Sequence, residues 1–345
     1  MNQTGKPLLR TLMGSRHSPP PIWLMRQAGR HLSEYRALRE KSSDFLNFCY
    51  SPELAVEATM QPVRRYRLDA AILFSDILVI PDAFGQGVRF VTGEGPKLDA
   101  IADGDPLPAF DADKLHDHLS PVYETVARLA DELPDMVGLI GFAGAPWTVA
   151  TYMVEGGSSR DYQKIRSWAY QNPDSFQILI DLLVDATAAY LGRQISHGAE
   201  AVQLFDSWAG VLPPVEFERW VIQPTAEIVR RLRIEHGDIP VIGFPRGAGA
   251  QYPVYAEQAG VDCISLDQTV PLDWAAKSLP QGMAVQGNLD NLLLLAGGEA
   301  MADAARAIIA AFSDRPHIFN LGHGILPETP PEHVERLCAV VRGED

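Results

Sequence analysis

The chain has 345 residues, of which 46% are hydrophobic and 21% are charged, a composition typical of globular proteins with a large core. Its 44 acidic and 29 basic residues give a formal net charge of −15, which repels nucleic acid and excludes it as an expected partner. No segment resembles a signal peptide or approaches the roughly 18 apolar residues of a membrane-spanning helix. Three separated cysteines form no C-x-x-C pair. We therefore expect a soluble, cytoplasmic protein without a membrane partner.

Short apolar or β-branched runs recur along the chain and are typical of strands buried on both faces. The eight candidate strands are residues 21–25, 70–74, 137–142, 201–205, 240–244, 263–266, 283–287 and 317–322. Segments with helical periodicity and capping signals lie between them, most clearly at 51–67, 120–133, 172–198, 213–237 and 330–341. The alternation predicts an α/β fold with a parallel sheet.

Eight strand–helix units in a chain of this length match a single (β/α)8 TIM barrel, and an open doubly wound sheet is the rival. We expect one barrel domain over residues 1–345, with residues 1–20 as an N-terminal extension that is flexible in part. Nearly every candidate strand ends in a polar residue, namely Arg26, Asp76, Asp206 with Ser207, Arg246, Asp267, Asn288 and His323. In a barrel these ends converge on one mouth, whereas an open sheet scatters them along an edge, so we favour the barrel.

Arg26 and Arg30 follow the first apolar run and are separated by small or amide residues at 27–29. Such residues let a ligand approach the backbone closely. The guanidinium fork suits carboxylates, which favours an anion site. The alternative is a surface ion pair with a carboxylate such as Glu34 or Glu40.

Asp76 lies between two apolar runs, where it could be a helix N-cap or an ion-pair partner. In a cavity of low dielectric constant it could instead accept N–H donors or stabilise a developing cation. A later strand breaks at Gly144 and leads into a short helix that carries Tyr152, either a packed aromatic or a site residue. The Gly-Gly-Ser-Ser segment 156–159 is typical of a mobile loop over a site.

The run Phe205, Asp206, Ser207 and Trp208 mixes aromatic and polar side chains at a strand end. It suits a flat ligand with polar edges, although a capped strand exit is an equal alternative. His323 follows the last strand between two glycines. A lone histidine is usually structural, but the adjoining glycines expose this imidazole at the strand end and raise the odds of a ligand contact.

Several motif searches are negative. The sequence contains no G-x-x-x-x-G-K-[ST] and no G-x-S-x-G, and residues 85–90 lack the third glycine of G-x-G-x-x-G. His116 and His118 lie in a segment rich in aspartate, more typical of a solvated surface than of a metal site. No nucleotide cofactor and no metal are expected.

Seven motifs together resemble the uroporphyrinogen decarboxylase family, in the family's order and from Pro21 to Val334. They are RQAGR at 26–30, FSDILVIPDAFG at 74–85, GFAGAPWT at 141–148, TYMVEGG at 151–157, QLFDSWAG at 203–210, QGNLD at 286–290 and FNLGHGILPETPPEHV at 319–334. The resemblance implies a (β/α)8 barrel, a homodimer, a cytoplasmic location in bacteria, a role in haem and related tetrapyrrole synthesis, and catalysis without metal or organic cofactor. The chain departs from the family pattern at His31, Ser33 and Asn291, where tyrosine, proline and proline are more typical.

Carried over motif by motif, the resemblance implies the following substrate contacts: Arg26, Gln27, Ala28, Gly29, Arg30, Asp76, Tyr152, Phe205, Ser207 and His323. Asp76, Arg26 and Tyr152 are the implied catalytic residues. The implied substrate is a reduced macrocycle with eight carboxylates and four pyrrole N–H groups. Asp76 would accept the N–H donors, the arginines would grip carboxylates, Phe205 would cover the ring, and Arg26 is a candidate for proton delivery.

Two rival functions follow from the same residues. A corrinoid methyltransferase on this barrel needs a zinc site with His and Cys ligands, but Cys263 has no H-x-C beside it. A non-catalytic tetrapyrrole carrier would need the arginine clamp but not the buried carboxylate. The joint presence of Asp76, Arg26 and Tyr152 therefore favours the enzyme.

Overall fold

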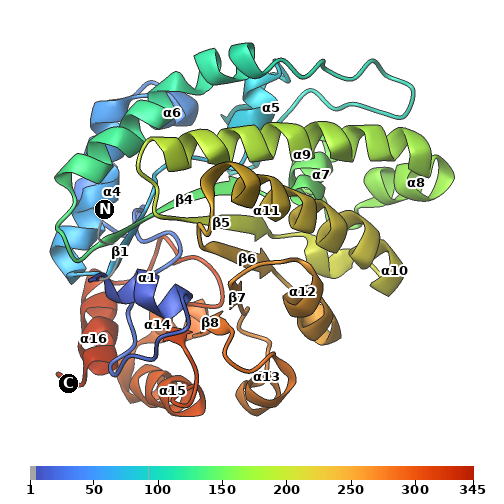
Figure 1. The fold of residues 1–345 in the computed structure, drawn as a ribbon. Coiled ribbons are helices and arrows are strands. Elements are labelled where there is room, and N and C mark those ends of the chain that lie inside the picture. Colours follow the sequence, from blue (N-terminus) through green and yellow to red (C-terminus); the bar gives the residue numbers. More distant parts are fainter. Residues whose placement is uncertain (1–4, 92) are drawn as a thin grey trace.

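The computed structural model describes residues 5–91 and 93–345. Within this part of the chain, seven parallel strands form one curled sheet in the order β1-β4-β5-β6-β7-β8-β9 (Figure 1). They are β1 (Ala70–Ile72), β4 (Gly138–Gly144), β5 (Ala201–Asp206), β6 (Val241–Pro245), β7 (Cys263–Ser265), β8 (Ala284–Gln286) and β9 (His317–Ile318). Each overlaps a predicted strand region, and β4, β5 and β6 extend one or two residues past it. A separate antiparallel hairpin, not predicted, pairs β2 (Arg89–Val91) with β3 (Gly95–Lys97).

The eighth predicted strand, residues 21–25, is an isolated parallel bridge of Ile22 with Phe319 rather than a strand. On one side the Phe319 N–H donates to the carbonyl of Pro21 at 2.8 Å, and on the other the Asp69 N–H donates to the carbonyl of Ile22 at 2.9 Å. The Ile22 N–H donates to the side-chain carboxylate of Asp69 at 2.8 Å. This carboxylate takes the place of the backbone carbonyl that a strand would supply. The segment therefore lies between β9 and the residue before β1.

Helices connect the strands and surround the sheet. They are α1 (Pro7–Leu12), α2 (Ser33–Arg39), α3 (Phe45–Cys49), α4 (Pro52–Tyr66), α5 (Val79–Ala83), α6 (Ala112–Glu132), α7 (Pro146–Glu155), α8 (Gln163–Gln171), α9 (Pro173–Ser196), α10 (Pro214–Phe217), α11 (Gln223–His236), α12 (Tyr252–Gln258), α13 (Leu272–Ser278), α14 (Asn291–Ala296), α15 (Gly298–Ala311) and α16 (Pro331–Arg342). The predicted helices 51–67, 172–198 and 330–341 correspond closely to α4, α9 and α16.

Two helix predictions differ from the structure. The helix expected at 120–133 begins eight residues earlier, because the carboxylate of Asp111 accepts the N–H of Lys114 at 3.2 Å and caps α6 there. The helix expected at 213–237 is interrupted by a π-helical turn at Glu218–Ile222, between α10 and α11. Such a turn inserts a residue into the helical ladder and is common near functional sites.

Side chains from every strand of the sheet fill the space inside its curl. The inner cluster consists of Trp23, Met25, Ala70, Ile140, Ala201, Ile242, Phe244, Cys263, Ala284 and Ile318, closed below by Leu8, Leu9 and Leu12 of α1. Within the predicted N-terminal extension, residues 7–12 thus form a helix with a buried apolar face, and residues 1–4 lie outside the described chain.

A buried polar layer crosses this interior. The indole N–H of Trp23 donates to the side-chain Oε1 of Gln286 at 2.9 Å. The amide of Gln286 donates to Gln203 at 3.1 Å and to Ser265 at 3.0 Å. Because β5 and β8 are not neighbours in the sheet, their side chains can meet only across the curl. An open doubly wound sheet would not bring these residues together.

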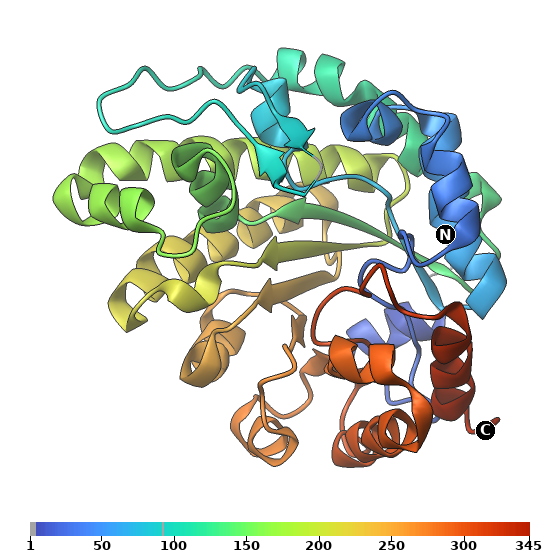
Figure 2. The same ribbon diagram turned by 180° about the vertical axis from the view of Figure 1, so that it is seen from behind.

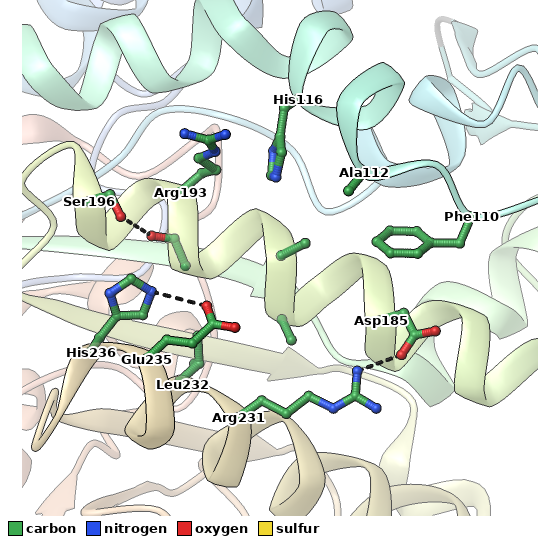
Figure 3. A pocket seen from close by; sticks show the side chains of 13 residues that line it. Phe110, Ala112, His116, Asp185, Arg193, Ser196, Arg231, Leu232, Glu235 and His236 are labelled. Carbon is green, nitrogen blue, oxygen red and sulfur yellow. Dashed lines mark hydrogen bonds and ion pairs between the residues drawn. The ribbon is translucent and has the colours of Figure 1, made fainter.

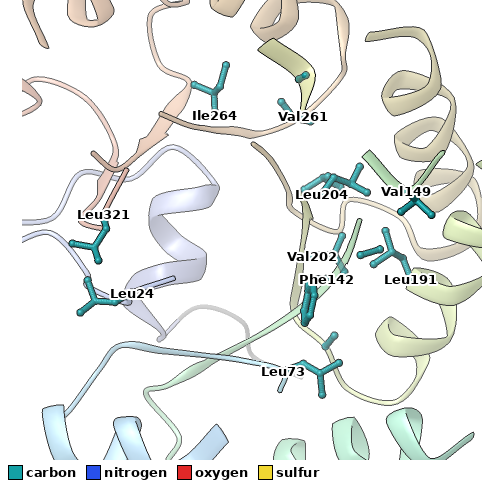
Figure 4. Close-up of a cluster of buried hydrophobic side chains, with 14 of the residues drawn as sticks. Leu24, Leu73, Phe142, Val149, Leu191, Val202, Leu204, Val261, Ile264 and Leu321 are labelled. Carbon is teal, nitrogen blue, oxygen red and sulfur yellow. The ribbon is translucent and has the colours of Figure 1, made fainter. Parts of the chain in front are cut away.

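The outer face of the sheet packs on the helices. Figure 4 shows this layer, in which Val202 and Leu204 of β5 lie near Val149 of α7 and Leu191 of α9. Among the described helices, α9 is long and apolar enough to cross a membrane, but two thirds of its apolar window is buried in this layer. We therefore assign it to the core.

The two ends of the helical layer meet. Arg342 of α16 donates to the carbonyl of Tyr66, the last residue of α4, at 3.0 Å. Figure 2 shows the red C-terminal helix beside the blue N-terminal helices. Helices from the first and last thirds of the chain are thus adjacent, as the bridge between Ile22 and Phe319 requires.

Candidate active site

Most of the predicted site residues lie at the carboxyl ends of the strands or in the segments that directly follow them. This is the end of a parallel α/β structure where active sites form. Phe205 lies within β5, and Tyr152 lies on α7, the helix that follows β4. The structure therefore gathers residues that are up to 297 positions apart, from Arg26 to His323.

Arg26 has a left-handed backbone, with φ at 59°, which is uncommon for a residue other than glycine. Its side chain is exposed and lies against Gly324, where an added Cβ would overlap the Cγ and Cδ of the arginine. Among the described residues, no hydrogen bond or ion pair engages the guanidinium of Arg26 or that of Arg30. Glu34, one of the alternative partners considered for this pair, is bound to Arg65 instead.

Gln27 supports this loop from below. Its side chain is 1% exposed. The side-chain carbonyl accepts the N–H of Leu24 at 3.1 Å, and the side-chain amide donates to the carbonyl of Ala70 in β1 at 3.2 Å. The side chain is therefore committed to holding the arginine loop on the sheet. Ala28 and Gly29 are half-buried and leave room above the loop.

Asp76 lies in the short segment between β1 and α5 and is half-buried. Its Oδ1 accepts the N–H of Leu78 at 2.9 Å. Burial raises the pKa of Asp76 to about 6, although the Leu78 hydrogen bond and the positive charge of Arg26 act in the opposite direction. The carboxylate is thus close to Arg26, poorly hydrated, and ionised at neutral pH.

Tyr152 lies on α7, which begins at Pro146, a residue favoured in the first turn of a helix. The helix ends after Glu155 because the next residue, Gly156, has a left-handed φ of 76°. The phenol ring is tilted against Trp208, with ring centroids 6.1 Å apart. Burial, followed by the negative charge of Asp76, raises the pKa of Tyr152 to about 12. The hydroxyl therefore stays protonated and can donate a hydrogen bond.

Three phenylalanines form an aromatic layer near the carboxyl ends of the central strands. Phe205 of β5 contacts Phe142 of β4 and Phe244 of β6 edge to face, with ring centroids 5.6 and 6.1 Å apart. Phe205 is only half-buried, whereas the other two are 8% and 1% exposed. An accessible ring supported by two buried rings offers a flat apolar surface to a ligand.

The residues after β5 are held by a contact that sequence reasoning missed. Asp206 is 2% exposed, and its Oδ1 accepts the hydroxyl of Thr148 on α7 at 2.5 Å. The same Thr148 oxygen accepts the N–H of Trp208 at 3.1 Å. Burial raises the pKa of Asp206 to about 7. This pair fixes the segment that carries Ser207 and Trp208 against the helix that carries Tyr152.

His323 follows β9 and is half-buried. Burial, then the positive charges of Arg246 and Arg26, lower the pKa of His323 to about 3, so the ring is neutral over the physiological range. The side-chain amide of Asn291 donates to the carbonyl of Gly324 at 2.8 Å and anchors the loop next to His323. Asn291 is one of the three positions at which the sequence departs from the pattern described above, and here its side chain supports the loop.

The segment 156–159 is held by the unpredicted hairpin. The carbonyl of Gly156 accepts the N–H of Leu98 at 3.1 Å, and Gly157 forms an antiparallel bridge with Lys97 of β3. The hairpin and segment 156–159 are therefore joined by backbone contacts that the sequence did not predict, while the mobility of the segment stays a prediction.

A cavity of about 560 Å³ lies elsewhere, between α6, α9 and α11 (Figure 3). Arg231 in its wall is paired with Asp185 at 2.5 Å. Its other lining residues include Arg193 and His236, from the carboxyl-terminal halves of α9 and α11. Those helix ends lead into the amino ends of β5 and β6, so this cavity opens at the end of the sheet remote from Asp76.

In the described part of the chain, no group of three or more His, Cys, Asp or Glu side chains is arranged to hold a metal. The cysteines Cys49, Cys263 and Cys338 are buried and unpaired. His116 contacts the hydroxyl of Tyr123 and His118 the carboxylate of Asp82, at 2.9 and 2.8 Å. The site thus consists of arginine, carboxylate, phenol, imidazole and aromatic groups.

Comparison with solved structures identifies the fold. A methyltransferase from Methanosarcina mazei superposes with a TM-score of 0.81, covers 97% of each chain and is 19% identical in sequence. At this identity the likeness concerns the fold alone. The match agrees with a curled parallel sheet surrounded by helices.

Comparison of sequences identifies the family. The chain is 54% identical to a uroporphyrinogen decarboxylase from Rhodospirillum rubrum over 99% of this chain and 98% of that one. It is 56% identical to a uroporphyrinogen decarboxylase from Rhizorhabdus wittichii over 98% of each. The family model described as uroporphyrinogen decarboxylase (URO-D) matches residues 3–343. The chain belongs to the uroporphyrinogen decarboxylase family.

Proposed function

We propose that this carboxy-lyase removes the four acetate carboxyl groups of uroporphyrinogen III, giving coproporphyrinogen III and CO2 without a metal or organic cofactor. The reaction would serve haem or a related tetrapyrrole pathway. The observation that carries the proposal is the position of Asp76, a half-buried carboxylate after β1 on which the charge of Arg26 acts, while that guanidinium has no ion-pair partner among the described residues. It supplies a fixed negative charge next to a carboxylate-binding group.

The chemistry requires an electron sink. Loss of CO2 from a pyrrole acetate leaves a carbanion unless the pyrrole ring has first been protonated. The protonated ring accepts the electron pair of the breaking C–C bond and becomes an exocyclic methylene. A second proton then adds to this methylene to complete the methyl group, and the ring releases the first proton to restore the pyrrole, so that one net proton replaces CO2. Asp76, accepting pyrrole N–H donors in a poorly hydrated site, stabilises the cation at the moment it forms. Arg26 holds the reacting acetate and is the proposed proton donor to the ring.

The remaining residues have binding roles in this proposal. Arg30 binds a second substrate carboxylate at the rim of the site. The backbone of Gln27, Ala28 and Gly29 lies under that carboxylate. Phe205 packs on one face of the macrocycle, while Ser207, Tyr152 and His323 donate hydrogen bonds to carboxylates at its edge. Support for these roles comes from the neutral His323, the protonated Tyr152 and the accessible ring of Phe205.

We further propose that the sheet is a complete (β/α)8 barrel forming a single domain. Residues 21–25 would take the eighth position, between β9 and β1. Their hydrogen bonds to Phe319 and Asp69 support this, as does the polar layer that joins β5 to β8 across the interior. A homodimer in the cytoplasm is the assembly and location that we expect from the family.

The test is to incubate purified, metal-stripped protein with uroporphyrinogen III under anaerobic conditions, then oxidise the mixture and separate the porphyrins by number of carboxyl groups. Stepwise appearance of seven-, six-, five- and four-carboxylate products is the expected result. Unreacted eight-carboxylate substrate from folded protein would overturn the proposal. Binding without turnover would then indicate a carrier, and activity restored only by zinc and a corrinoid would indicate a methyltransferase.

A further inference from the structure

Arg246 directly follows β6, at the same end of the sheet as the site described above. Counted along the sheet from residues 21–25, β6 is the fourth strand in either direction. The order is β1, β4, β5, β6 one way and β9, β8, β7, β6 the other. Arg246 and Arg26 therefore start from opposite sides of the ring of strands.

The backbone at Arg246 is rigidly held. Its N–H donates to the carbonyl of Asp206 at 3.1 Å, and its own carbonyl accepts the N–H of Gly210 at 3.0 Å. The next residue, Gly247, donates its N–H to Asp267 at 2.8 Å. A Cβ on Gly210 would overlap the Gly247 carbonyl, so the loops after β5 and β6 are in close contact. A side chain on such a support has a defined starting point, so binding orders the rotamers of the arginine but not the loop that carries it.

The guanidinium of Arg246 has no carboxylate partner among the residues that the structure describes, and the side chain is half-buried. Asp267, a buried acid that binds the N–H of the next residue, is already saturated. It accepts the hydroxyl of Tyr252 at 2.8 Å, the N–H of Gly247 at 2.8 Å, and both the N–H and the hydroxyl of Thr269. Arg246 is therefore a half-buried cation on a rigid backbone, and no residue in the described ranges 5–91 and 93–345 serves as its counterion.

The groups that face Arg246 define what it can bind. Its charge and that of Arg26 both act on His323, and its charge also acts on the phenol of Tyr162 beside α8. Tyr162 in turn packs on Trp208, with ring centroids 5.5 Å apart. The charge of Arg246 thus reaches both the loop of His323 and the segment that carries Tyr162. Two arginines on either side of a neutral imidazole form a clamp for a ligand with anionic groups at opposite edges.

We propose that Arg246 binds a carboxylate at the edge of the substrate opposite Arg26, an inference that rests on the proposed function. An eight-carboxylate macrocycle presents such groups on every side, and the reacting acetate occupies only one. Arg246 would hold the far edge and so keep the reacting ring over Asp76. When a partly decarboxylated macrocycle leaves and binds again with another pyrrole ring over Asp76, Arg246 binds whichever carboxylate then lies at the edge opposite Arg26.

The test compares Arg246→Gln and Arg246→Lys with wild type. Arg306→Gln on α15, an exposed arginine paired with Asp303 and Asp345, is the matched control. We expect R246Q to raise KM for uroporphyrinogen III about tenfold with kcat changed less than about threefold. R246K should give an intermediate KM, and R306Q should be unchanged. An unchanged KM in a folded R246Q protein, or a loss confined to kcat, overturns the inference.

Two further measurements complete the design. Equilibrium binding of uroporphyrinogen III, followed anaerobically by quenching of tryptophan fluorescence, reports on Arg246 even if wild type shows no turnover. Failure of the proposed function is therefore distinguishable from failure of this inference. Repeating the kinetics with the five-carboxylate intermediate identifies the group bound, because that substrate keeps all its propionates but only one acetate. A KM effect that persists assigns a propionate to Arg246, and one that disappears assigns an acetate.

Discussion

The side chain of Arg26 lies directly over Gly324, so closely that a Cβ on the glycine would overlap the Cγ and Cδ of the arginine. The two residues come from the first and last motifs of the chain, and the loop of His323 thereby sets the path of the arginine. The absence of a side chain at position 324 is a requirement of the site rather than of the turn, because Gly324 has no positive φ.

Gly324→Ala should therefore displace Arg26 without unfolding the protein. The overlapping atoms are methylenes of a flexible side chain that can rotate away at little cost in stability. We expect KM for uroporphyrinogen III to rise several-fold, in the same direction as Arg26→Ala but by less. The control is Gly5→Ala, where an added Cβ would meet only Sδ of Met136 at 3.9 Å. Equal kinetics in G324A and wild type would contradict the proposed role of Arg26.

Asp76→Asn should reduce kcat by about 10²–10³-fold, the usual loss when one preorganised electrostatic group is removed from a transition state. Asparagine retains an oxygen that can accept the N–H of Leu78, so the segment before α5 keeps its conformation. The measurement is kcat with the eight-carboxylate substrate. A rate within about threefold of wild type would remove the cation-stabilising role from Asp76.

The same variant has a stability signature of known sign. Burial raises the pKa of Asp76 to about 6, above its ordinary value of 3.8, so the folded state binds this proton more tightly than the unfolded state. The stability gained from protonation is complete below about pH 4 and is lost as pH rises through 6. Asp76→Asn should therefore have a higher Tm than wild type at pH 8, with a difference that shrinks towards pH 4. A lower Tm at pH 8 would show that the ionised carboxylate stabilises the fold.

The rate should fall in acid for the same reason. If the ionised form of Asp76 is the active one, kcat drops by up to tenfold per pH unit below about pH 6. His323, with its pKa lowered to about 3, does not titrate in this range. Asp206 does, with a pKa of about 7, so Asp206→Asn is the necessary control. An acidic limb that vanishes in D206N would belong to Asp206 and not to Asp76.

The strand predictions were accurate because a buried parallel strand leaves a continuous apolar run, and seven of the eight runs contain strands of the described sheet. Residues 21–25 are the exception, since the Asp69 side chain replaces a backbone partner there. The first two turns of α6 were missed because their charged and histidine side chains indicated a solvated surface segment, although Leu115 and Leu119 have the same helical spacing as Val122 and are buried with it. The left-handed backbone of Arg26 gives no local signal, because glycine or asparagine is the residue expected there.

The site was foreseen as a set of strand ends, but its supports were not. That Gln27 is a buried brace depends on its reach to Ala70, and that Asp206 faces α7 depends on how this helix packs on β5. Such contacts join residues far apart in sequence and leave no periodic pattern. The pairing of Thr148 with Asp206 could be found only after the two motifs had been brought together by the fold.

Thr148→Val tests that pairing. Valine has a similar shape but leaves the buried carboxyl of Asp206 without its donor and the N–H of Trp208 without its acceptor. We expect a loss of about 1–3 kcal/mol in the free energy of urea unfolding, the usual cost of buried unsatisfied groups. Thr148→Ser keeps the hydroxyl and should lose much less.

The dependence of that loss on pH separates the two broken contacts. The Thr148 hydroxyl opposes the burial that raises the pKa of Asp206 to about 7, so its removal raises this pKa further. An ionised Asp206 is then most costly at pH 8, whereas at pH 5 the carboxyl is protonated in both folded proteins and only the hydrogen bonds are lost. The T148V deficit should therefore be larger at pH 8 than at pH 5. A deficit independent of pH would mean that Thr148 acts through the Trp208 loop alone.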